Sequence, residues 1–340
     1  MINGDILRDA WISAANNIGN HRKAVDDLNI FPVPDGDTGT NMSMTLSNAA
    51  RELEKLSGET AGKVASVNSS ALLRGARGNS GVITSLLFRG FAKGIGNDEF
   101  VTPENIKNAF VFGVEAAYKA VMKPTEGTIL TVARVASEYA VKAFEEGKDE
   151  LAIFEYAIEG AKKALDETPE MLPVLKKAGV IDAGGKGYLI IIEAMLASLQ
   201  GKEFAAPEVK AVQEPKDKAD FSDFDTEDIK FAYCTEFIIG RENDKDPQLL
   251  REFLDKLGDS IVVVDDEEII KVHVHNNCPG VVITEALTYG HLVTVASCQA
   301  GNIFHSAVVI HHNFQHIGIG GLDFLVYHDN GHGAQQASCV

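Results

Sequence analysis

The stretch Asn29–Leu46, "NIFPVPDGDTGTNMSMTL", places two carboxylates, Asp35 and Asp37, between a proline-rich approach and a helical apolar pattern. Like charges this close destabilise each other unless a cation is shared between them. Carboxylate oxygens are hard ligands suited to Mg2+, and the backbone N–H groups at a helix start suit a phosphate. The stretch therefore predicts a Mg2+ and phosphate site, with an ordinary capped Asp-Gly turn as the plainer alternative.

Two further glycine-rich loops precede helical apolar patterns: "LLRGARGNSGVITSLLF" at 72–88 and "VIDAGGKGYLIII" at 180–192. Such loops present several N–H donors to a phosphate. Glycine also lets helices cross closely, so each loop alone is weak evidence, and neither is a Walker A sequence. Three loops of this kind in one helical domain favour a nucleotide site.

The first two hundred residues read as helix almost throughout. Apolar residues recur three and four apart in Ala-rich segments that are separated by short Gly, Pro and Asn punctuation. This pattern predicts an all-α domain of about eight helices over residues 1–200. Residues 201–228 mix Pro, Lys and acids with little periodic apolar content, which is typical of a linker.

Beyond the linker the apolar period becomes strand-like. Residues 229–296 read as β-α-β-β-α-β, with "IKFAYCTEFIIG" and "EIIKVHVH" among the strands. That order predicts a smaller α/β domain of the split βαβ, ferredoxin-like kind, in which two helices pack on one antiparallel sheet.

The tail, residues 297–340, differs in composition from the chain before it. No Lys, Arg or Glu follows Glu285, and seven of the ten histidines fall between His291 and Val340. Two interpretations stay open: a flexible or metal-binding His-rich end, or a stretch that is not native to this fold, as after a frameshift in a truncated chain. We expect little function there.

Overall composition narrows the function classes. The 340 residues carry a formal charge of -18, which argues against nucleic acid or an anionic membrane as the main partner. The start, "MINGDILRDAW", does not look like a secretory signal, and no apolar run is long enough for a membrane helix. We therefore predict a cytoplasmic protein without integral membrane association. Four sparse cysteines favour free thiols or metal ligands over a disulfide framework.

Four segments, "NIFPVPDGDTGTNM", "GARGNSGVI", "KPTEGTILTVAR" and "DAGGKGYL", resemble in order and spacing the nucleotide-binding (DhaL-like) domain of the dihydroxyacetone kinase family. More closely, the chain resembles the catalytic subunits of bacterial fatty acid kinases, from Asp5 to about residue 290. The resemblance implies an antiparallel eight-helix barrel that binds ATP and Mg2+ in the loops at one end. It makes Asp35 and Asp37 the Mg2+ ligands and catalytic residues. It also implies nucleotide contacts at Thr38, Gly39, Thr40, Asn41, Gly78, Asn79, Ser80, Gly81, Asp182 and Gly184.

One position departs from the family pattern. Dihydroxyacetone kinases place a third metal-binding aspartate where this chain has Ile30. The nearest available oxygen ligand is the side chain of Asn29, so Asn29 becomes a candidate third Mg2+ ligand.

A second metal site is predicted in the α/β domain. His273 and His275 lie two apart on a strand and so point to the same face. Cys234 lies on another strand, which is predicted to be adjacent to the strand of the two histidines. One thiolate and two imidazoles suit Zn2+ with an open fourth position. Strand histidines are often no more than polar surface residues, and Cys278 could compete as a ligand. The resemblance favours zinc, because fatty acid kinase relatives carry a Cys and two-His site in this domain.

The resemblance implies transfer of the ATP γ-phosphate to a fatty acid carboxylate, presented by a separate fatty-acid-binding (DegV-like) protein, to give an acyl phosphate. One alternative is a dihydroxyacetone (glycerone) kinase or another small-alcohol kinase, which would need a substrate domain of a size that this sequence does not show. Another is a non-catalytic nucleotide-binding or metal-binding regulatory protein. A homodimeric state is left open.

Overall fold

The computed structural model describes residues 1–202, 204–206 and 230–299, with short strands at 306–307, 310–311, 325–328 and 335–336. Most of the predicted linker, 201–228, and of the predicted atypical tail, 297–340, lies outside these described residues. The chain divides into two compact units. The first, the helical unit, is Met1–Lys119 with Pro124–Phe224, and the second, the sheet unit, is Ala120–Lys123 with Asp225–Val340.

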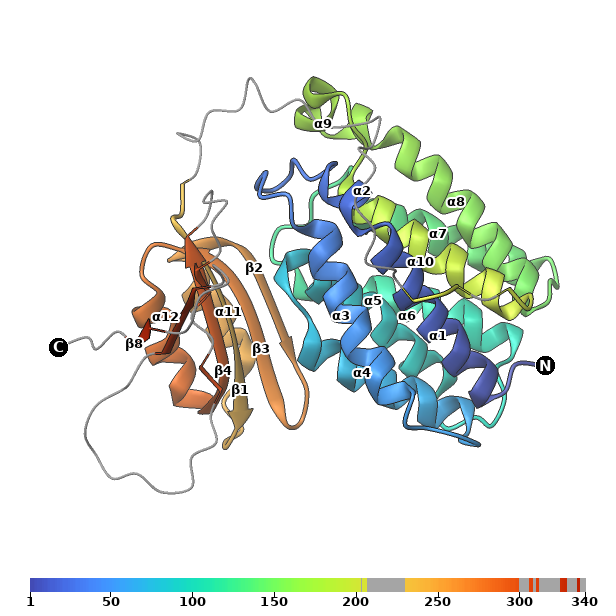
Figure 1. Cartoon of the computed structure of the whole chain (residues 1–340), viewed down its shortest axis with the longest axis horizontal. Helices are drawn as coiled ribbons and strands as arrows, with labels where there is room; N and C mark the ends of the chain where they lie inside the picture. The colour runs from blue at the N-terminus through green and yellow to red at the C-terminus, as the bar shows by residue number, and fades with distance from the viewer. Residues whose placement is uncertain are drawn as a thin grey trace. The chain divides into compact units, whose positions relative to one another are not determined.

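The helical unit confirms the prediction of an almost wholly helical first domain. Its eight long helices have 15 to 22 residues, whereas α2 and α9 have five and six. The long helices lie side by side (Figure 1), and their closure into a barrel stays a prediction. The helices are α1 (Gly4–Asn20), α2 (Arg22–Asp26), α3 (Thr38–Leu53), α4 (Ala61–Gly75), α5 (Gly78–Ile95), α6 (Pro103–Ala120), α7 (Ile129–Glu145), α8 (Glu150–Met171), α9 (Pro173–Ala178) and α10 (Ala183–Leu199).

Local sequence explains where these helices begin and end. The side chains of Asn3, Thr60 and Asp149 accept a hydrogen bond from a first-turn N–H of α1, α4 and α8 respectively, which supplies an acceptor that the helix itself lacks. Gly96 follows α5 with φ of 62°, a conformation that glycine adopts without a steric penalty. No helix among the described residues combines the length and apolar character needed to cross a bilayer.

An aromatic cluster fills the core of the helical unit. The ring of Trp11 lies 4.5 Å from that of Phe88 and 5.5 Å from that of Phe91, both edge-on, which is a preferred aromatic geometry. Phe91 continues the cluster to Phe110, and Phe110 continues it to Phe154. The cluster joins α1, α5, α6 and α8, so it ties the α5 helix of the second glycine-rich loop into the core.

The sheet unit adopts the predicted β-α-β-β-α-β order. Its sheet has the strand order β2-β3-β1-β4, with antiparallel pairing throughout, and β6 (Ile310–His311) pairs with β4. The elements are β1 (Tyr233–Arg241), α11 (Pro247–Leu254), β2 (Gly258–Asp265), β3 (Ile269–Asn276), α12 (Pro279–Ala286), the 3-10 turn η2 (Leu287–Tyr289) and β4 (Gly290–Gln299). Beyond them β5 (Ser306–Ala307), β7 (Leu325–His328) and β8 (Gln335–Gln336) form a second small sheet.

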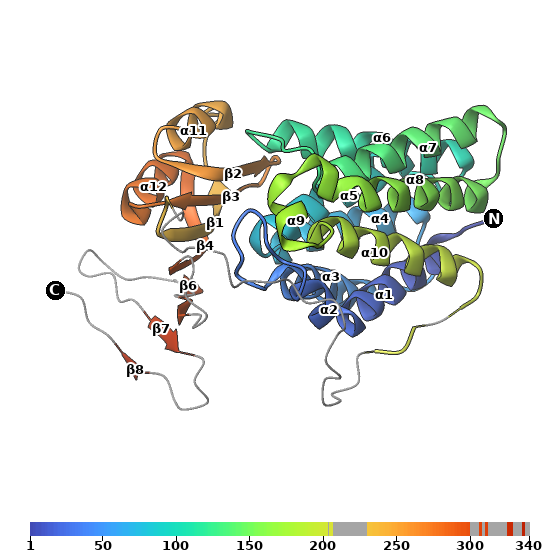
Figure 2. The same ribbon diagram turned by 90° about the horizontal axis from the view of Figure 1, so that it is seen from above.

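The two helices α11 and α12 cover one face of this sheet (Figure 2). Leu250 and Val282, one from each helix, are fully buried against strand residues such as Val272. A feature that the sequence did not reveal is the segment Ala120–Lys123, which begins at the last residue of α6. In the structure this segment belongs to the sheet unit, where Val121 forms an antiparallel bridge with Val262 of β2.

Candidate nucleotide site and metal centre

The loop that carries Asp35 and Asp37 is braced from within by Asn29. The Asn29 side-chain amide donates to the Val33 carbonyl at 2.7 Å and to Asp35 Oδ1 at 3.1 Å. Its oxygen accepts from the backbone N–H of Thr38 at 3.2 Å and from the Thr38 hydroxyl. Because the oxygen is engaged by Thr38, Asn29 acts as a brace in this geometry, and its role as a Mg2+ ligand stays a prediction.

Asp26, which the sequence patterns did not single out, caps the start of α3. Its carboxylate accepts from the Thr40 N–H at 2.9 Å, from the Thr40 hydroxyl at 2.8 Å and from the Gly39 N–H. Burial raises the pKa of Asp26, and the nearby charge of Asp37 raises it further, against the lowering by these hydrogen bonds. The first amides of α3, where phosphate contacts were expected at Thr38, Gly39 and Thr40, are thus satisfied by Asn29 and Asp26.

The start of α5 lies directly beside the start of α3. A methyl group on Gly78 would be 2.4 Å from the side-chain nitrogen of Asn41, and one on Gly81 would be 2.4 Å from Thr45 Oγ1. The same Thr45 hydroxyl accepts from the backbone N–H of Arg77 at 3.1 Å. Glycine at both positions lets the two helix starts approach closely, so the first two motifs lie beside each other.

The start of α5 also fits a phosphate better than that of α3. Neither N-cap residue, Asp37 of α3 or Arg77 of α5, makes a side-chain capping bond, but the first amides of α3 have Asn29 and Asp26 as side-chain acceptors. The side-chain oxygen of Asn79 is buried without a hydrogen-bond partner among the described residues. Asp35 is exposed, and Asp37, the N-cap residue of α3, is half-buried. Helix-start amides, the orphaned oxygen and carboxylates are groups of the kind that bind a phosphate and Mg2+.

Asp182 joins the third and fourth motifs. Its Oδ2 accepts from the Gly185 N–H at 2.7 Å, which caps α10, and the carboxylate also accepts from the Ile129 N–H at the start of α7. Its own backbone N–H donates to Thr168 Oγ1 at 3.1 Å. Burial raises the pKa of Asp182 to about 6, although the two backbone hydrogen bonds lower it. The carboxylate is therefore used as a double helix cap, and its predicted nucleotide contact stays a prediction.

All four motif helices begin close together. A methyl group on Gly184 would be 3.2 Å from Ile129 Cβ, which places the start of α10 against that of α7. One on Gly187 would be 2.5 Å from the sulfur of Met42, which places the first turns of α10 against those of α3. Helix N-termini carry a partial positive charge, so their convergence creates a region that favours an anion.

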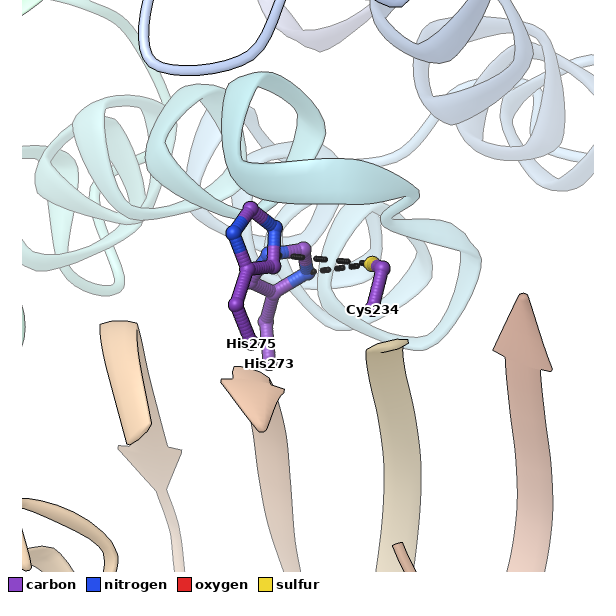
Figure 3. A group of neighbouring side chains, drawn as sticks. All are labelled: Cys234, His273 and His275. Atoms are coloured by element: carbon purple, nitrogen blue, oxygen red, sulfur yellow. Dashed lines mark hydrogen bonds between the residues drawn. The ribbon is translucent and has the colours of Figure 1, made fainter. Parts of the chain in front are cut away.

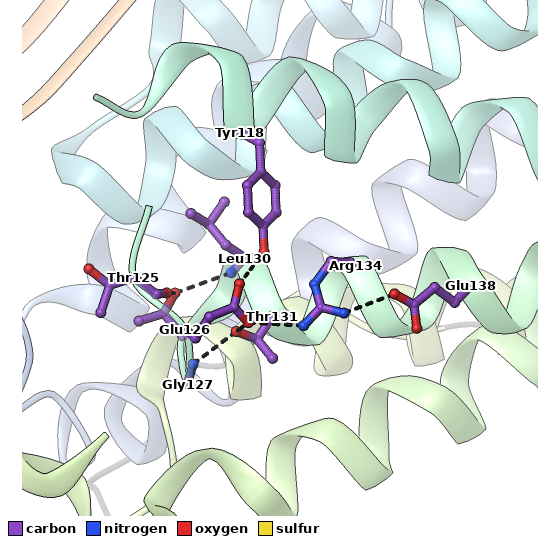
Figure 4. Close-up of polar contacts among 9 residues, drawn as sticks. Tyr118, Thr125, Glu126, Gly127, Leu130, Thr131, Arg134 and Glu138 are labelled. Atoms are coloured by element: carbon purple, nitrogen blue, oxygen red, sulfur yellow. Dashed lines mark hydrogen bonds and ion pairs between the residues drawn. The ribbon is translucent and has the colours of Figure 1, made fainter. Parts of the chain in front are cut away.

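The motif "KPTEGTILTVAR" forms a polar network around Glu126 (Figure 4). The Glu126 carboxylate accepts from the Tyr118 hydroxyl at 3.0 Å, the Thr131 hydroxyl at 2.8 Å and the Arg134 guanidinium at 2.9 Å. Burial alone would raise the pKa of Glu126, but these hydrogen bonds together lower it. The Gly127 N–H donates to Thr131 Oγ1 at 2.8 Å, so the network fixes the loop that leads into α7.

The predicted ligands of the second metal site come together in the sheet unit (Figure 3). Cys234 Sγ and one nitrogen from each of His273 and His275 all lie within 4.8 Å of one another. Burial and, to a smaller extent, the neighbouring His273 lower the pKa of His275 to about 3, against an opposing effect of Glu236, which keeps the ring in the neutral form that binds metals. Cys278 is exposed at the N-cap of α12 and is not a member of this group.

Comparison with known families agrees with this geometry. The DAK2 domain model matches residues 32–197, and the model of the FakA-like middle domain, named for fatty acid kinase, matches residues 230–297. The chain therefore contains a DAK2 domain followed by a FakA-like middle domain. The DAK2 match contains the four motifs except for Asn29–Phe31, and the middle domain contains the Cys234, His273 and His275 cluster.

Similar proteins occur in staphylococci. An uncharacterized protein of Staphylococcus haemolyticus is 45% identical over 298 residues, which are 86% of this chain and 54% of the relative. Uncharacterized proteins of Staphylococcus aureus and Staphylococcus saprophyticus are 44% and 43% identical over the same shares of each chain. The chain therefore spans about half the length of the curated relatives it matches.

Solved structures of dihydroxyacetone kinase from C. freundii are also similar. The complex with AMP-PNP and Mg2+ aligns with a TM-score of 0.41 and 16% identity, over 56% of this chain and 33% of that one. The native form aligns with a TM-score of 0.40 and 15% identity, over 58% and 36%.

Proposed function

We propose that this DAK2-domain protein is an ATP-dependent, Mg2+-requiring kinase that phosphorylates the carboxylate of a fatty acid. The single observation that carries the proposal is the convergence of four helix starts, among them the start of α3, which follows Asp37, and the start of α5, whose N-cap side chain makes no capping bond. Phosphoryl transfer depends mainly on positioning and on stabilising charge. A site of carboxylates and backbone amides suits that demand without a nucleophilic side chain.

The residues divide the binding of ATP between two helix starts. Asp35 and Asp37 would hold Mg2+, which when bound neutralises charge on the phosphates. The first amides of α5 and the Ser80 hydroxyl would donate to phosphate oxygens, and the orphaned oxygen of Asn79 would take a donor or a Mg2+-bound water. Asn29 and Asp26 would keep the metal-binding loop fixed on α3.

A carboxylate acceptor is consistent with the groups at this site. A fatty acid is already ionised at neutral pH, so no general base is needed, whereas an alcohol acceptor must lose a proton. The carboxylate oxygen would bond to the γ-phosphorus while the bond from that phosphorus to the β-γ bridging oxygen breaks. The electron pair would leave with ADP. We propose that the fatty acid arrives on a separate fatty-acid-binding (DegV-like) protein.

Trapping of the product tests this proposal. The chain, ATP, Mg2+ and a lipid-loaded fatty-acid-binding protein are incubated with hydroxylamine, which converts an acyl phosphate into a hydroxamate. We expect hydroxamate with the wild type and none with Asp37→Ala. Phosphorylation of dihydroxyacetone in place of the fatty acid would identify a small-alcohol kinase. Nucleotide binding without turnover of either acceptor would identify a non-catalytic protein.

We further propose that the middle domain binds one Zn2+ through Cys234, His273 and His275. The distances support this, because tetrahedral Zn2+ with its usual bond lengths separates a thiolate sulfur and an imidazole nitrogen by about 3.6 Å. Cys234 Sγ lies 3.9 Å from each ring nitrogen of His273. A shift of a few tenths of an ångström would bring this pair to that separation, and the ligand nitrogen of His275 lies within 4.8 Å of both groups.

A further inference from the structure

A fourth polar side chain, Glu236, shares the sheet face of the three proposed zinc ligands. Cys234 and Glu236 are two apart on β1, and they lie directly opposite His275 and His273 of β3. Because side chains alternate along a strand, all four project from one face. This is the face opposite to the apolar core under α11 and α12, to which Val272 and Val274 belong.

Glu236 touches one of the two histidines. Its Oε1 lies 2.8 Å from Nδ1 of His273, and the two side chains are 13% and 2% exposed. The group whose ligand atoms all lie within 4.8 Å of one another consists of Cys234, His273 and His275 and does not include Glu236. The carboxylate is therefore placed beside a ligand, at hydrogen-bond distance, and outside the ligand set.

We propose that Glu236 is a positioning residue that accepts the Nδ1–H of His273 and thereby commits Nε2 of this ring to the metal. The inference rests on the zinc site of the proposed function. A histidine that binds a metal through one nitrogen usually donates its other N–H to a carboxylate or carbonyl, which fixes the ring and its tautomer. Here Cys234 Sγ is 3.9 Å from both ring nitrogens, so its position does not determine which nitrogen binds the metal. The contact of Glu236 with Nδ1 leaves Nε2 for the metal.

A similar pair on the same sheet provides a matched control. Glu242 Oε1 lies 2.9 Å from Nδ1 of His291, but there both side chains are exposed, at 63% and 59%. That pair has the same residue types at a similar distance. Among the described residues, it does not belong to a group of possible metal ligands. Removal of the Glu242 carboxylate tests whether any effect at Glu236 is specific to the metal site.

The zinc affinity of the chain measures the role of Glu236. The wild type, Glu236→Ala, Glu236→Gln and Glu242→Gln are titrated with Zn2+ against a chromophoric chelator. Loss of an outer-shell partner typically weakens metal binding by about 10- to 100-fold, and we expect this for Glu236→Ala. Glu236→Gln keeps an acceptor oxygen, so we expect a smaller loss of zinc affinity. We expect Glu242→Gln to bind Zn2+ like the wild type. As a control on the ligand set, we expect the Co2+-loaded variants to keep the absorption bands of a Cys-ligated site.

The tautomer of His273 gives a second readout that needs no metal. In the zinc-free wild type, nitrogen-detected NMR is expected to find the proton on Nδ1, and in Glu236→Ala on Nε2, the form that free imidazole side chains prefer. A wild type that binds no Zn2+ overturns both the zinc site and this inference. Equal zinc affinity in Glu236→Ala, or a proton on Nε2 in the wild type, overturns only the role of Glu236 and leaves the zinc site standing.

Discussion

Asp182 holds a buried carboxylate whose ionisation opposes folding, so replacing it with alanine is expected to have an effect that depends on pH. Asp182→Ala removes the acceptor of the first amides of α10 and α7. The same substitution removes a buried charge. The first effect destabilises the helical unit by about 1–2 kcal/mol, and the second stabilises it wherever the carboxylate is ionised.

The magnitude follows from the pKa of about 6 in the folded chain against the ordinary value of 3.8. A folded pKa above the unfolded one means that the folded state binds the proton more tightly. The resulting stability is fully present below pH 3.8 and is lost as pH rises through 6. The shift corresponds to about 3 kcal/mol in total, of which about 2 kcal/mol is lost between about pH 4.5 and pH 7.5.

Urea unfolding followed by tryptophan fluorescence measures this directly in the helical unit. Trp11 is the single tryptophan of the chain and is 2% exposed in the aromatic cluster, so its emission reports unfolding of that unit. At about pH 4.5 we expect Asp182→Ala to be less stable than the wild type. At about pH 7.5 the difference should shrink by about 2 kcal/mol and vanish or change sign.

Asp149→Ala is the matched control, because Asp149 is an exposed residue that caps α8 through the Ala152 N–H at 2.9 Å. Its loss removes a cap without relieving a buried charge, so the destabilisation should be similar at both pH values. A difference for Asp182→Ala that is constant across the window, or that grows with pH, would refute the reasoning from burial.

Three other substitutions, one of them paired with a control variant, test the packing and the metal loop. A methyl group on Gly90 would lie 2.2 Å from the backbone of α6, so Gly90→Ala should lower the free energy of unfolding in urea by about 3 kcal/mol. The control Gly147→Ala, where φ is 72° and the space is open, should lower it by about 1 kcal/mol. Asp37→Ala should abolish Mg2+-dependent ATP binding in calorimetry with little loss of stability, and unchanged affinity would contradict the metal assignment. Asn29→Ala removes the acceptor of two Thr38 hydrogen bonds and should cost about 2 kcal/mol in the same unfolding assay; an unaltered midpoint would show that the brace is unimportant.

The sequence predicted the kinds of element well because each carries a local signal. Apolar spacing of three and four marks the long helices, and alternation marks β1 and β3, whose observed pairing sets Cys234 opposite His275. The sheet order β2-β3-β1-β4 also follows the predicted split βαβ pattern. The segment Ala120–Lys123 was missed because its bridge to Val262 is a contact between distant parts of the sequence, which no local pattern encodes.

The candidate site was predictable in its residue types and less so in their roles. Glycine and acid patterns identified the right loops, but an aspartate before a helix reads alike whether it binds a ligand or caps the helix. Asp26 and Asp182 accept from helix-start amides, and Asn29 turns its oxygen to Thr38. Glu236 carried a signal that could have been used, since C-x-E on one strand faces H-x-H on the next.

The distribution of caps has a consequence for how an acidic protein binds a polyanion. The chain carries a formal charge of -18, and three of the four converging helix starts are already satisfied by Asn29, Asp26 or Asp182. Of the four, the start of α5 has an N-cap residue without a side-chain capping bond, and ATP must bind there against repulsion from the acids around it. A divalent cation held by Asp35 and Asp37 would neutralise their two negative charges. Affinity for ATP should therefore depend steeply on Mg2+, because the metal removes a repulsion that the amides of α5 cannot offset by themselves.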